Sequence, residues 1–376
     1  MIKKQAEMKI DAMIYASPKI ALESKAVNQL CDAASLPPAR KTLATADIHV
    51  GFGIPIGCVL ALDNAIMPPA VGYDINCGMR LLSTPFKKDS FPIEAITASL
   101  QKNIPLGEGK ANLNLQRKHI NAVITQGVKS LPTLADSLSS QLLENFDSDQ
   151  LKQDLTKIED NGSLPASPAD IPSQAIEKGA NQLGTVGGGN HFIEIQYIQD
   201  ILSPEMAQHF NLQKNQIVVM LHFGSRRFGY EIADHYMNQA AKVTPQYKKM
   251  LAYLPADSLQ GKKYISAMNA ASNFAFTNRQ IVTMIVRKCF KKVFGPTQLD
   301  LIYDVTHNIA KYENHEGKNY WVHRKGATRA FGPARMKNTI FAKTGQPIIT
   351  PGSMGTESYF LTANDASEES LCSVNH

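Results

Sequence analysis

Two side chains that often bind metal lie three positions apart in VGYDINCGMR, residues 71–80: the carboxylate of Asp74 and the thiol of Cys77. They stand between Gly72 and Gly78. Glycine is typical of tight turns rather than of regular elements, so the spacing predicts a turn that presents both side chains. The two residues could be ligands of one metal ion. The alternative is a packed free cysteine beside a turn-forming aspartate, and the pair alone favours that alternative.

Three of the ten histidines have surroundings that suit a site. His191 follows three glycines in GGGNHFIE, His222 ends the apolar run of VVMLHFGSRR, and His307 ends that of LIYDVTHNIAK. A single histidine of this kind is usually structural, but strand ends are where functional side chains collect. Together with Asp74 and Cys77 they offer one carboxylate, one thiolate and three imidazoles. One tetrahedral ion would leave a ligand over, whereas two ions sharing the Cys77 sulfur would use all five. The mixture does not identify the metal.

Two glycine-rich segments could approach an anion closely. GTVGGGNH, residues 184–191, fits neither the Walker A spacing nor the dinucleotide-binding spacing. TPGSMGTES, residues 350–358, combines two glycines with the hydroxyl groups of Ser353, Thr356 and Ser358. Clustered glycines let backbone amides surround a phosphate. Each segment could equally be an ordinary turn, but together with a metal cluster they favour a nucleotide.

Basic residues follow two of the histidines. GSRRFG, residues 224–229, comes directly after His222, and VHRKGATRAFGPARMK, residues 322–337, lies beyond His307. A basic run is most often a solvated surface. Arginine also has the best shape for gripping a phosphate with two parallel hydrogen bonds.

The bulk composition is that of a globular protein. The chain has 376 residues, of which 43% are hydrophobic and 19% charged, with a net charge of +6. No apolar run approaches the length of a membrane span, and no signal-peptide pattern follows the N-terminus, so we expect a cytoplasmic protein. There is no CxxC pair among the five cysteines, which favours free thiols: Cys31, Cys58, Cys77, Cys289 and Cys372.

The elements that must position these residues are of both kinds. Helical patterns occupy about 93–160 and 264–294, and the segment 161–174, rich in proline and serine, reads as a loop. Strand patterns with intervening turns occur at 41–85, 216–224, 299–307 and 338–363. Because strands and helices do not alternate regularly, the sequence predicts an α+β fold.

Eight motifs in order resemble those of RtcB-type RNA ligases. The resemblance spans about residues 45–376 and rests on DIHVGFGIPIG, GYDINCGMR, GTVGGGNHFIEIQ, LHFGSRRFG, AASNFAFTNRQ, DVTHNIAK, VHRKGATRAF and PGSMGTESY. It implies mixed β-sheets flanked by helices around a metal and nucleotide cleft. It also implies one catalytic domain over residues 1–376. This domain would consist of an N-terminal segment at 1–90, a helical insertion at about 93–175 and a core at 176–376.

The same resemblance implies GTP- and Mn(II)-dependent joining of an RNA 3′-phosphate or 2′,3′-cyclic phosphate to a 5′-hydroxyl, in tRNA splicing or RNA repair. Two manganese ions would be bound, with Cys77 bridging, by Asp74, Cys77, His191, His222 and His307. Arg226 would hold an RNA phosphate, and His376 would become the GMP-histidine. The guanylate would contact Asn190, His191, Phe192, Ile193, Glu194, His307, Asn308, Pro351, Gly352, Ser353, Met354 and Ser358.

The sequence departs from the family pattern at its end. The nucleophilic histidine of the family opens HGAGR, whereas this chain reads LCSVNH and stops at His376. We therefore expect a chain truncated at the nucleophile, one that folds and binds Mn(II) but forms the His–GMP adduct poorly. Two alternatives are an inactive remnant that binds RNA ends and a metal-dependent phosphodiesterase without ligation. The natural RNA and any activating protein are left open.

Overall fold

The computed structural model describes residues 7–113, 115–137, 146–247, 249–353 and 355–376. The chain divides into two compact units, each built from separated segments. The first unit contains Met1–Asn76, Gly229–Met268 and Thr306–His376, and the second contains Cys77–Phe228 and Asn269–Val305. The sequence predicts one domain made of consecutive segments, and that single catalytic domain stays a prediction.

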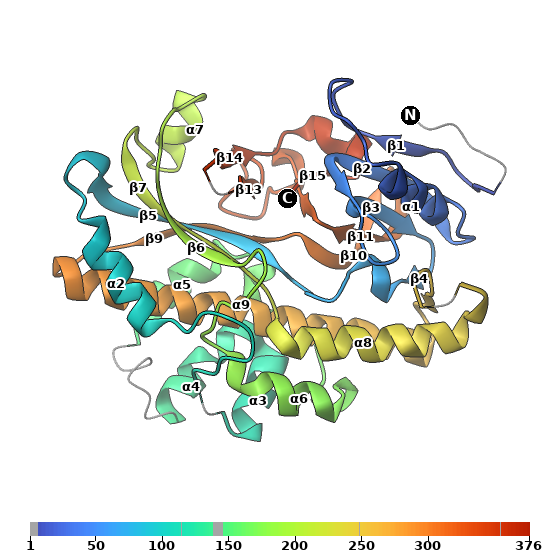
Figure 1. Ribbon diagram of the computed structural model, residues 1–376, viewed down its shortest axis with the longest axis horizontal. Coiled ribbons are helices and arrows are strands. Elements are labelled where there is room, and N and C mark those ends of the chain that lie inside the picture. The colour runs from blue at the N-terminus through green and yellow to red at the C-terminus, as the bar shows by residue number, and fades with distance from the viewer. Residues whose placement is uncertain (1–6, 114, 138–145, 248, 354) are drawn as a thin grey trace. The chain divides into compact units, whose positions relative to one another are not determined.

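The first unit is organised by a five-stranded sheet with the order β1-β2-β3-β11-β10, in which only β1 and β2 pair in parallel. Helix α1 lies against this sheet (Figure 1). Three short pairs accompany it: β4 with β8, β12 with β15, and β13 with β14. The bounds are β1 Ala12–Ile14, α1 Ser24–Ala34, β2 Ala39–His49, β3 Ile56–Leu62, β4 Ala65–Ile66, β8 Leu254–Pro255, β10 Asn308–His315, β11 Lys318–Lys325, β12 Ala327–Arg329, β13 Pro347–Thr350, β14 Tyr359–Thr362 and β15 Ser373–Asn375.

Strand β3 has a continuous apolar sequence because both faces of the sheet are buried there. Its side chains alternate between two buried clusters, so neither face is left to water. Cys58, Leu60 and Leu62 pack in the cluster that includes Leu30 of α1. Val59 and Ala61 pack in a second cluster, which also contains Leu371 near the end of the chain.

The second unit holds a four-stranded sheet with the order β6-β7-β5-β9. Strands β6 and β5 both pair antiparallel to β7. Its bounds are β5 Gly78–Lys87, α2 Ile93–Asn103, α3 Arg117–Gln126, α4 Leu131–Ser137, α5 Ser148–Leu155, α6 Ser173–Gly179, β6 Phe192–Tyr197, α7 Pro204–His209, β7 Gln216–Phe223 and β9 Asp300–Thr306. A boundary between the units in the sequence falls within each of two helices, α8 Arg226–Val243 and α9 Leu259–Phe294.

Most of the predicted elements are present, and the α+β prediction is confirmed. The apolar helix predicted at 264–294 is a portion of α9, which begins earlier, at Leu259. The loop predicted at 161–174 holds only short 3-10 turns before α6 begins at Ser173. A stretch of the helical pattern predicted at 93–160, residues 138–145, lies outside the described residues. No described helix, α9 included, is long and apolar enough to cross a membrane.

Within the second unit, α9 is fixed to the sheet by a buried ion network. Arg279 of α9 donates to both carboxylate oxygens of Asp304, at 2.8 and 2.9 Å. Arg80 of β5 donates to the same carboxylate at 2.6 Å. All three side chains are fully buried. Arg279 also donates to the carbonyl oxygen of Phe223 at 2.9 Å, which ties the end of β7 to the helix.

We expect Asp304→Asn to lower the free energy of unfolding by about 3–5 kcal/mol, because two buried arginines would lose their counter-charge. Urea unfolding at pH 7 measures this change. Asp63→Asn is the matched control, since Asp63 pairs with Arg40 at an exposed position, and it should cost at most about 1 kcal/mol. Equal losses in the two variants would contradict the prediction.

The same comparison should depend on pH. Burial alone would raise the pKa of Asp304, but Arg279 and Arg80 outweigh burial and lower it. A carboxyl group whose pKa is lower in the folded state stabilises the protein above its unfolded pKa, and this contribution disappears as the pH falls. The difference between wild type and Asp304→Asn should therefore shrink below about pH 4.

Candidate metal and nucleotide site

The segment with Asp74 and Cys77 forms the predicted turn, with one correction. Gly72 has φ +92° and Asn76 has φ +58°, so the left-handed positions are one glycine and one asparagine. Gly78 was expected in the turn, but it is the first residue of β5. In the first unit, the amide of Asn76 donates to the carbonyl oxygen of Asn308 at 2.7 Å. The Asn308 side-chain amide donates to the carbonyl oxygen of Asp74 at 3.2 Å, which fixes the turn from a second side.

In the second unit, Cys77 lies against two of the predicted histidine ligands. Its sulfur is 3.3 Å from Nε2 of His222 and 3.5 Å from Nε2 of His191. The imidazole rings of the two histidines are nearly perpendicular, at 79°. Two imidazole nitrogens therefore converge on one sulfur, an arrangement that suits a divalent transition-metal ion.

The tautomer of His222 is set by the backbone. Its Nδ1 lies 2.9 Å from the carbonyl oxygen of Asn190. Because that oxygen can only accept, Nδ1 carries the proton and Nε2 presents its lone pair toward Cys77. The ring is positioned by strand register, since His222 in β7 stands opposite Phe192 of β6 and Met79 of β5. The Phe192 ring packs edge-on against His222 with 5.2 Å between centroids.

In the first unit, His307 follows β9 and lies beside the predicted nucleophile. The rings of His307 and His376 are 5.0 Å apart. Nδ1 of His376 is 3.3 Å from a carboxylate oxygen of Asp47. Burial lowers the pKa of His376, the Asp47 carboxylate raises it and His49 lowers it further. The Asp47 carboxylate is thus at ion-pair distance from Nδ1 but makes no hydrogen bond to it.

Asp47 has a geometric role that sequence reasoning missed. It opens the motif DIHVGFGIPIG, but it lies 329 positions from His376 in the chain, at 376 − 47. Strand β2 contains Asp47, and the last strand, β15, ends immediately before His376. No spacing rule connects two residues so far apart.

Asn278 of α9 was also missed, and it holds the first glycine-rich segment. Its side-chain oxygen accepts from the amides of Gly184 and Thr185 at 2.7 and 3.3 Å. Its side-chain nitrogen donates to the carbonyl oxygen of Thr185 at 2.9 Å. One buried amide thus completes three backbone hydrogen bonds that the irregular segment cannot make internally.

Arg226, the predicted RNA-phosphate ligand, lies over the same segment. Its Nε donates to the Thr185 hydroxyl at 3.2 Å. A Cβ placed on Gly187 would collide with the Arg226 guanidinium, and Gly187 has φ +106°. Arg226 itself is left-handed, with φ +57°, at the start of α8. Position 187 therefore requires glycine for two reasons: its positive φ, and the Arg226 guanidinium that occupies the space of a Cβ atom.

We expect Gly187→Ala to displace the Arg226 guanidinium and weaken RNA binding about tenfold, in line with the loss of one phosphate contact. Gly189→Ala is the matched control, because Gly189 also has a positive φ, +73°, but nothing lies within 4 Å of an added Cβ. Fluorescence anisotropy with a labelled 3′-phosphate RNA measures both variants. If the control weakens binding as much as Gly187→Ala, the effect comes from backbone strain and not from Arg226.

The second glycine-rich segment joins β13 to β14, as the sequence predicts. The amide of Gly352 donates to the hydroxyl of Ser358 at 3.0 Å, which closes the loop on itself. Ser353 is exposed at its tip, and Pro351 is half-buried. Met354, predicted to contact the guanylate, lies outside the described residues. The guanylate contacts of both segments stay predictions.

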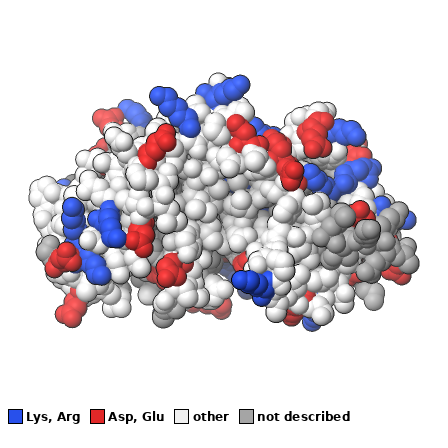
Figure 2. All heavy atoms as spheres, turned by 90° about the horizontal axis from the view of Figure 1, so that it is seen from above, with Lys and Arg blue, Asp and Glu red and all other residues white. Residues whose placement is uncertain are grey.

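The first residues of the second basic stretch are buried, so they neither face solvent nor bind phosphate. Arg324 is fully buried and pairs with Glu313. The Lys325 ammonium is enclosed by the carbonyl oxygens of Phe52, Ile54 and Pro69. The reason is that β11 is an inner strand of the five-stranded sheet. On the face drawn in Figure 2, described acidic and basic side chains are interspersed, with no single broad basic field.

These features define an α+β protein with a cysteine–histidine centre suited to a metal ion and with two glycine-rich segments. A family model described as "tRNA-splicing ligase RtcB" matches residues 29–376. The chain belongs to the RtcB family, as the motifs predict.

Its relatives include enzymes of several organisms. The tRNA-splicing ligase RtcB of Methanococcus maripaludis is 37% identical, with 94% of this chain and 76% of the relative covered. That of Thermococcus kodakarensis is 37% identical, with 97% and 78% covered. RNA-splicing ligase RtcB homolog 1 of Entamoeba histolytica is 38% identical, with 94% and 69% covered. Truncation at His376 stays a prediction.

Proposed function

We propose that this protein is an RNA ligase that joins an RNA 3′-phosphate or 2′,3′-cyclic phosphate to a 5′-hydroxyl, with GTP as the energy source. The observation that carries the proposal is the similarity to ligases over 94% of the chain, combined with the convergence of His191 and His222 on Cys77. Transfer-RNA exons and broken RNAs are the proposed substrates, and the cytoplasm is the proposed location.

Cys77, His191 and His222 fit a divalent transition metal, and we propose Mn(II), two ions in all. The donor set mixes sulfur and nitrogen, and the His222 tautomer presents the lone pair of Nε2 toward Cys77. Asp74 and His307 are the further proposed ligands. When bound, such ions draw negative charge from phosphoryl oxygens and activate water. The chain supplies sulfur and nitrogen donors at fixed positions, and the Cys77 thiol would lose its proton when an ion binds.

His376 is proposed to carry the guanylate. Its Nε2 would attack the α-phosphorus of GTP, forming an N–P bond while the bond to the β-phosphate oxygen breaks and pyrophosphate leaves. Asp47, whose carboxylate lies 3.3 Å from Nδ1, is proposed to favour the proton on that nitrogen and to orient the ring. The RNA 3′-phosphate then takes the guanylate from His376, and attack by the 5′-hydroxyl on the activated phosphate expels GMP. Arg226 and backbone amides of the glycine-rich segments are proposed to bind phosphates.

Incubation with α-³²P-GTP and Mn(II) tests the proposal. A ligase retains label on the protein and passes it to a 3′-phosphate RNA. A phosphodiesterase would cut RNA without label, and an inactive binder would do neither. Complete absence of label under saturating Mn(II) and GTP, as distinct from slow labelling, would contradict the proposed function.

We expect GTP to be preferred over ATP by at least about 100-fold in this labelling, because polar groups placed for the guanine N1–H and amino group would be left unpaired by adenine. Glu194 in β6 is the proposed acceptor. Competition of each unlabelled nucleotide against labelled GTP measures the ratio. Equal labelling by ATP and GTP would remove the assignment of a guanine site.

A further inference from the structure

The turn before the last strand has a costly backbone conformation. Leu371 has φ +53° and Cys372 has φ +46°, two consecutive left-handed residues without a glycine. L-residues adopt this conformation only when their surroundings determine it. We call these two residues the C-terminal turn. Both side chains are buried, and Leu371 packs in the cluster on one face of the five-stranded sheet.

Arg324 holds one side of the C-terminal turn. From its buried place in β11, it donates to the carbonyl oxygen of Leu371 at 2.9 Å and to the hydroxyl of Ser373 at 2.8 Å. It forms a two-pronged ion pair with Glu313 at 2.7 and 2.8 Å. The guanidinium therefore links β10, β11 and the turn in one plane of hydrogen bonds.

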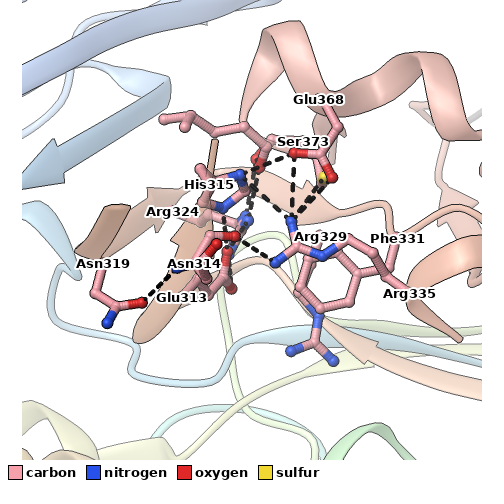
Figure 3. Close-up of polar contacts among 12 residues, drawn as sticks. Glu313, Asn314, His315, Asn319, Arg324, Arg329, Phe331, Arg335, Glu368 and Ser373 are labelled. Atoms are coloured by element: carbon pink, nitrogen blue, oxygen red, sulfur yellow. Dashed lines mark hydrogen bonds and ion pairs between the residues drawn. The ribbon is translucent and has the colours of Figure 1, made fainter. Parts of the chain in front are cut away.

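Arg335 holds the other side. Its Nη1 lies 3.3 Å from the sulfur of Cys372 and 3.1 Å from a carboxylate oxygen of Glu368. Its Nη2 donates to the carbonyl oxygen of Asn314 at 2.7 Å. Figure 3 shows Arg324 and Arg335 reaching the same cluster from different segments, with His315 between Glu313 and Glu368.

His315 joins the two halves. Its Nε2 is 3.0 Å from Glu313 and its Nδ1 is 3.2 Å from Glu368. Burial alone would lower the pKa of His315, but contacts with Cys372 and Glu313 raise it to about 9. A protonated ring can donate from both nitrogens, so it bridges the two carboxylates.

The C-terminal turn leads directly to the proposed nucleophile. Residues 373–375 form β15, which pairs with β12 in the register Arg329 to Ser373 and Ala327 to Asn375. His376 follows at once. We propose that Arg324 and Arg335 are positioning residues: they hold the C-terminal turn left-handed and so set the place of the His376 imidazole for guanylate transfer. The effect on guanylate transfer rests on the proposed function, whereas the contacts that hold the C-terminal turn do not depend on it.

A metal ion is the main alternative use of this cluster. Donor atoms of His315, Glu368 and Cys372 all lie within 4.8 Å of one another. The Arg335 guanidinium nitrogen, however, stands within 3.4 Å of all three groups. A cation of the protein itself thus occupies the place an ion would take, and Arg324 adds a second positive charge nearby. The geometry therefore favours the structural role, in which Arg324 and Arg335 hold the C-terminal turn. We call this arrangement the clamp.

Arg335→Ala in the full 376-residue chain tests the clamp, because Arg335 is partly exposed and its loss should leave the fold intact. We expect amides 373–375 to exchange hydrogen at least about tenfold faster, since local opening becomes easier. We expect the rate of His–GMP formation to fall at least about tenfold, because a small misplacement of the nucleophile slows its attack. Mn(II) content and GTP affinity should stay within about twofold. Arg40→Ala, at an exposed pair, is the matched control and should change none of these.

Strain supplies an independent variant pair. Cys372→Ala loses the sulfur contact but still pays the cost of a left-handed backbone. Cys372→Gly loses the contact and is also relieved of that cost. The alanine variant should therefore form the adduct more slowly than the glycine variant.

Unchanged exchange in Arg335→Ala would overturn the clamp. Faster exchange with an unchanged labelling rate would overturn the positioning role. Stoichiometric zinc that Cys372→Ala removes would replace the clamp by a metal site. If wild type takes no label, the proposed function has failed, and the exchange measurement alone still decides the clamp.

Discussion

Replacing Cys77 by alanine should lower the affinity for Mn(II) by at least about 100-fold and abolish label transfer from GTP, because a thiolate at a metal centre contributes more than the surrounding groups. The expectation follows from the positions of His191 and His222, whose Nε2 atoms both face the Cys77 sulfur. Without it, the imidazoles would remain with Asp74 as the one proposed ligand whose charge offsets that of the ion. Titration followed by electron paramagnetic resonance of free Mn(II) measures the affinity directly, apart from activity.

Two controls separate this effect from general damage. Cys58→Ala removes a fully buried thiol whose pKa burial raises to about 12, so it should cost stability and leave Mn(II) binding unchanged. His209→Gln alters an exposed histidine of α7 and should change neither. If Cys77→Ala binds as much Mn(II) as wild type, the bridging role is wrong, whatever happens to activity.

His376→Ala should lower GMP labelling by at least about 1,000-fold while Mn(II) binding persists, because removal of a nucleophile leaves only binding and electrostatic contributions. The label on wild type should be lost in acid and kept in alkali, as expected for a phosphoramidate. Gel autoradiography after each treatment gives both results. Label of equal amount on His376→Ala would place the adduct on another residue.

Asp47→Asn is the companion variant. Asparagine preserves the shape of the side chain but removes the charge 3.3 Å from Nδ1 of His376, so the ring can turn or take the wrong tautomer. We expect labelling about 100-fold slower than wild type, with unchanged metal content. Unchanged labelling would mean that another group orients His376.

The local motifs were enough to place most elements. Period and composition predicted β7, β9 and α9, because alternating or continuous apolar residues reflect which face is buried. They also indicate Asp74, Cys77, His191, His222 and His307 as one set, of which Cys77, His191 and His222 meet within the second unit. Gly78 was misjudged as belonging to the turn, because glycine is permissive in a strand as well as in a turn.

What the sequence by itself determined is the family, the α+β class and the identity of the chemically suited side chains, because these depend on residue types and short-range order. Only the tertiary structure decided the partners. Three contacts show this. His222 and the Asn190 carbonyl are 32 positions apart (222 − 190), His376 and Asp47 are 329 apart (376 − 47), and Arg324 and Leu371 are 47 apart (371 − 324). Such contacts follow from strand register and buried charge pairing, and neither leaves a periodic signal in the chain.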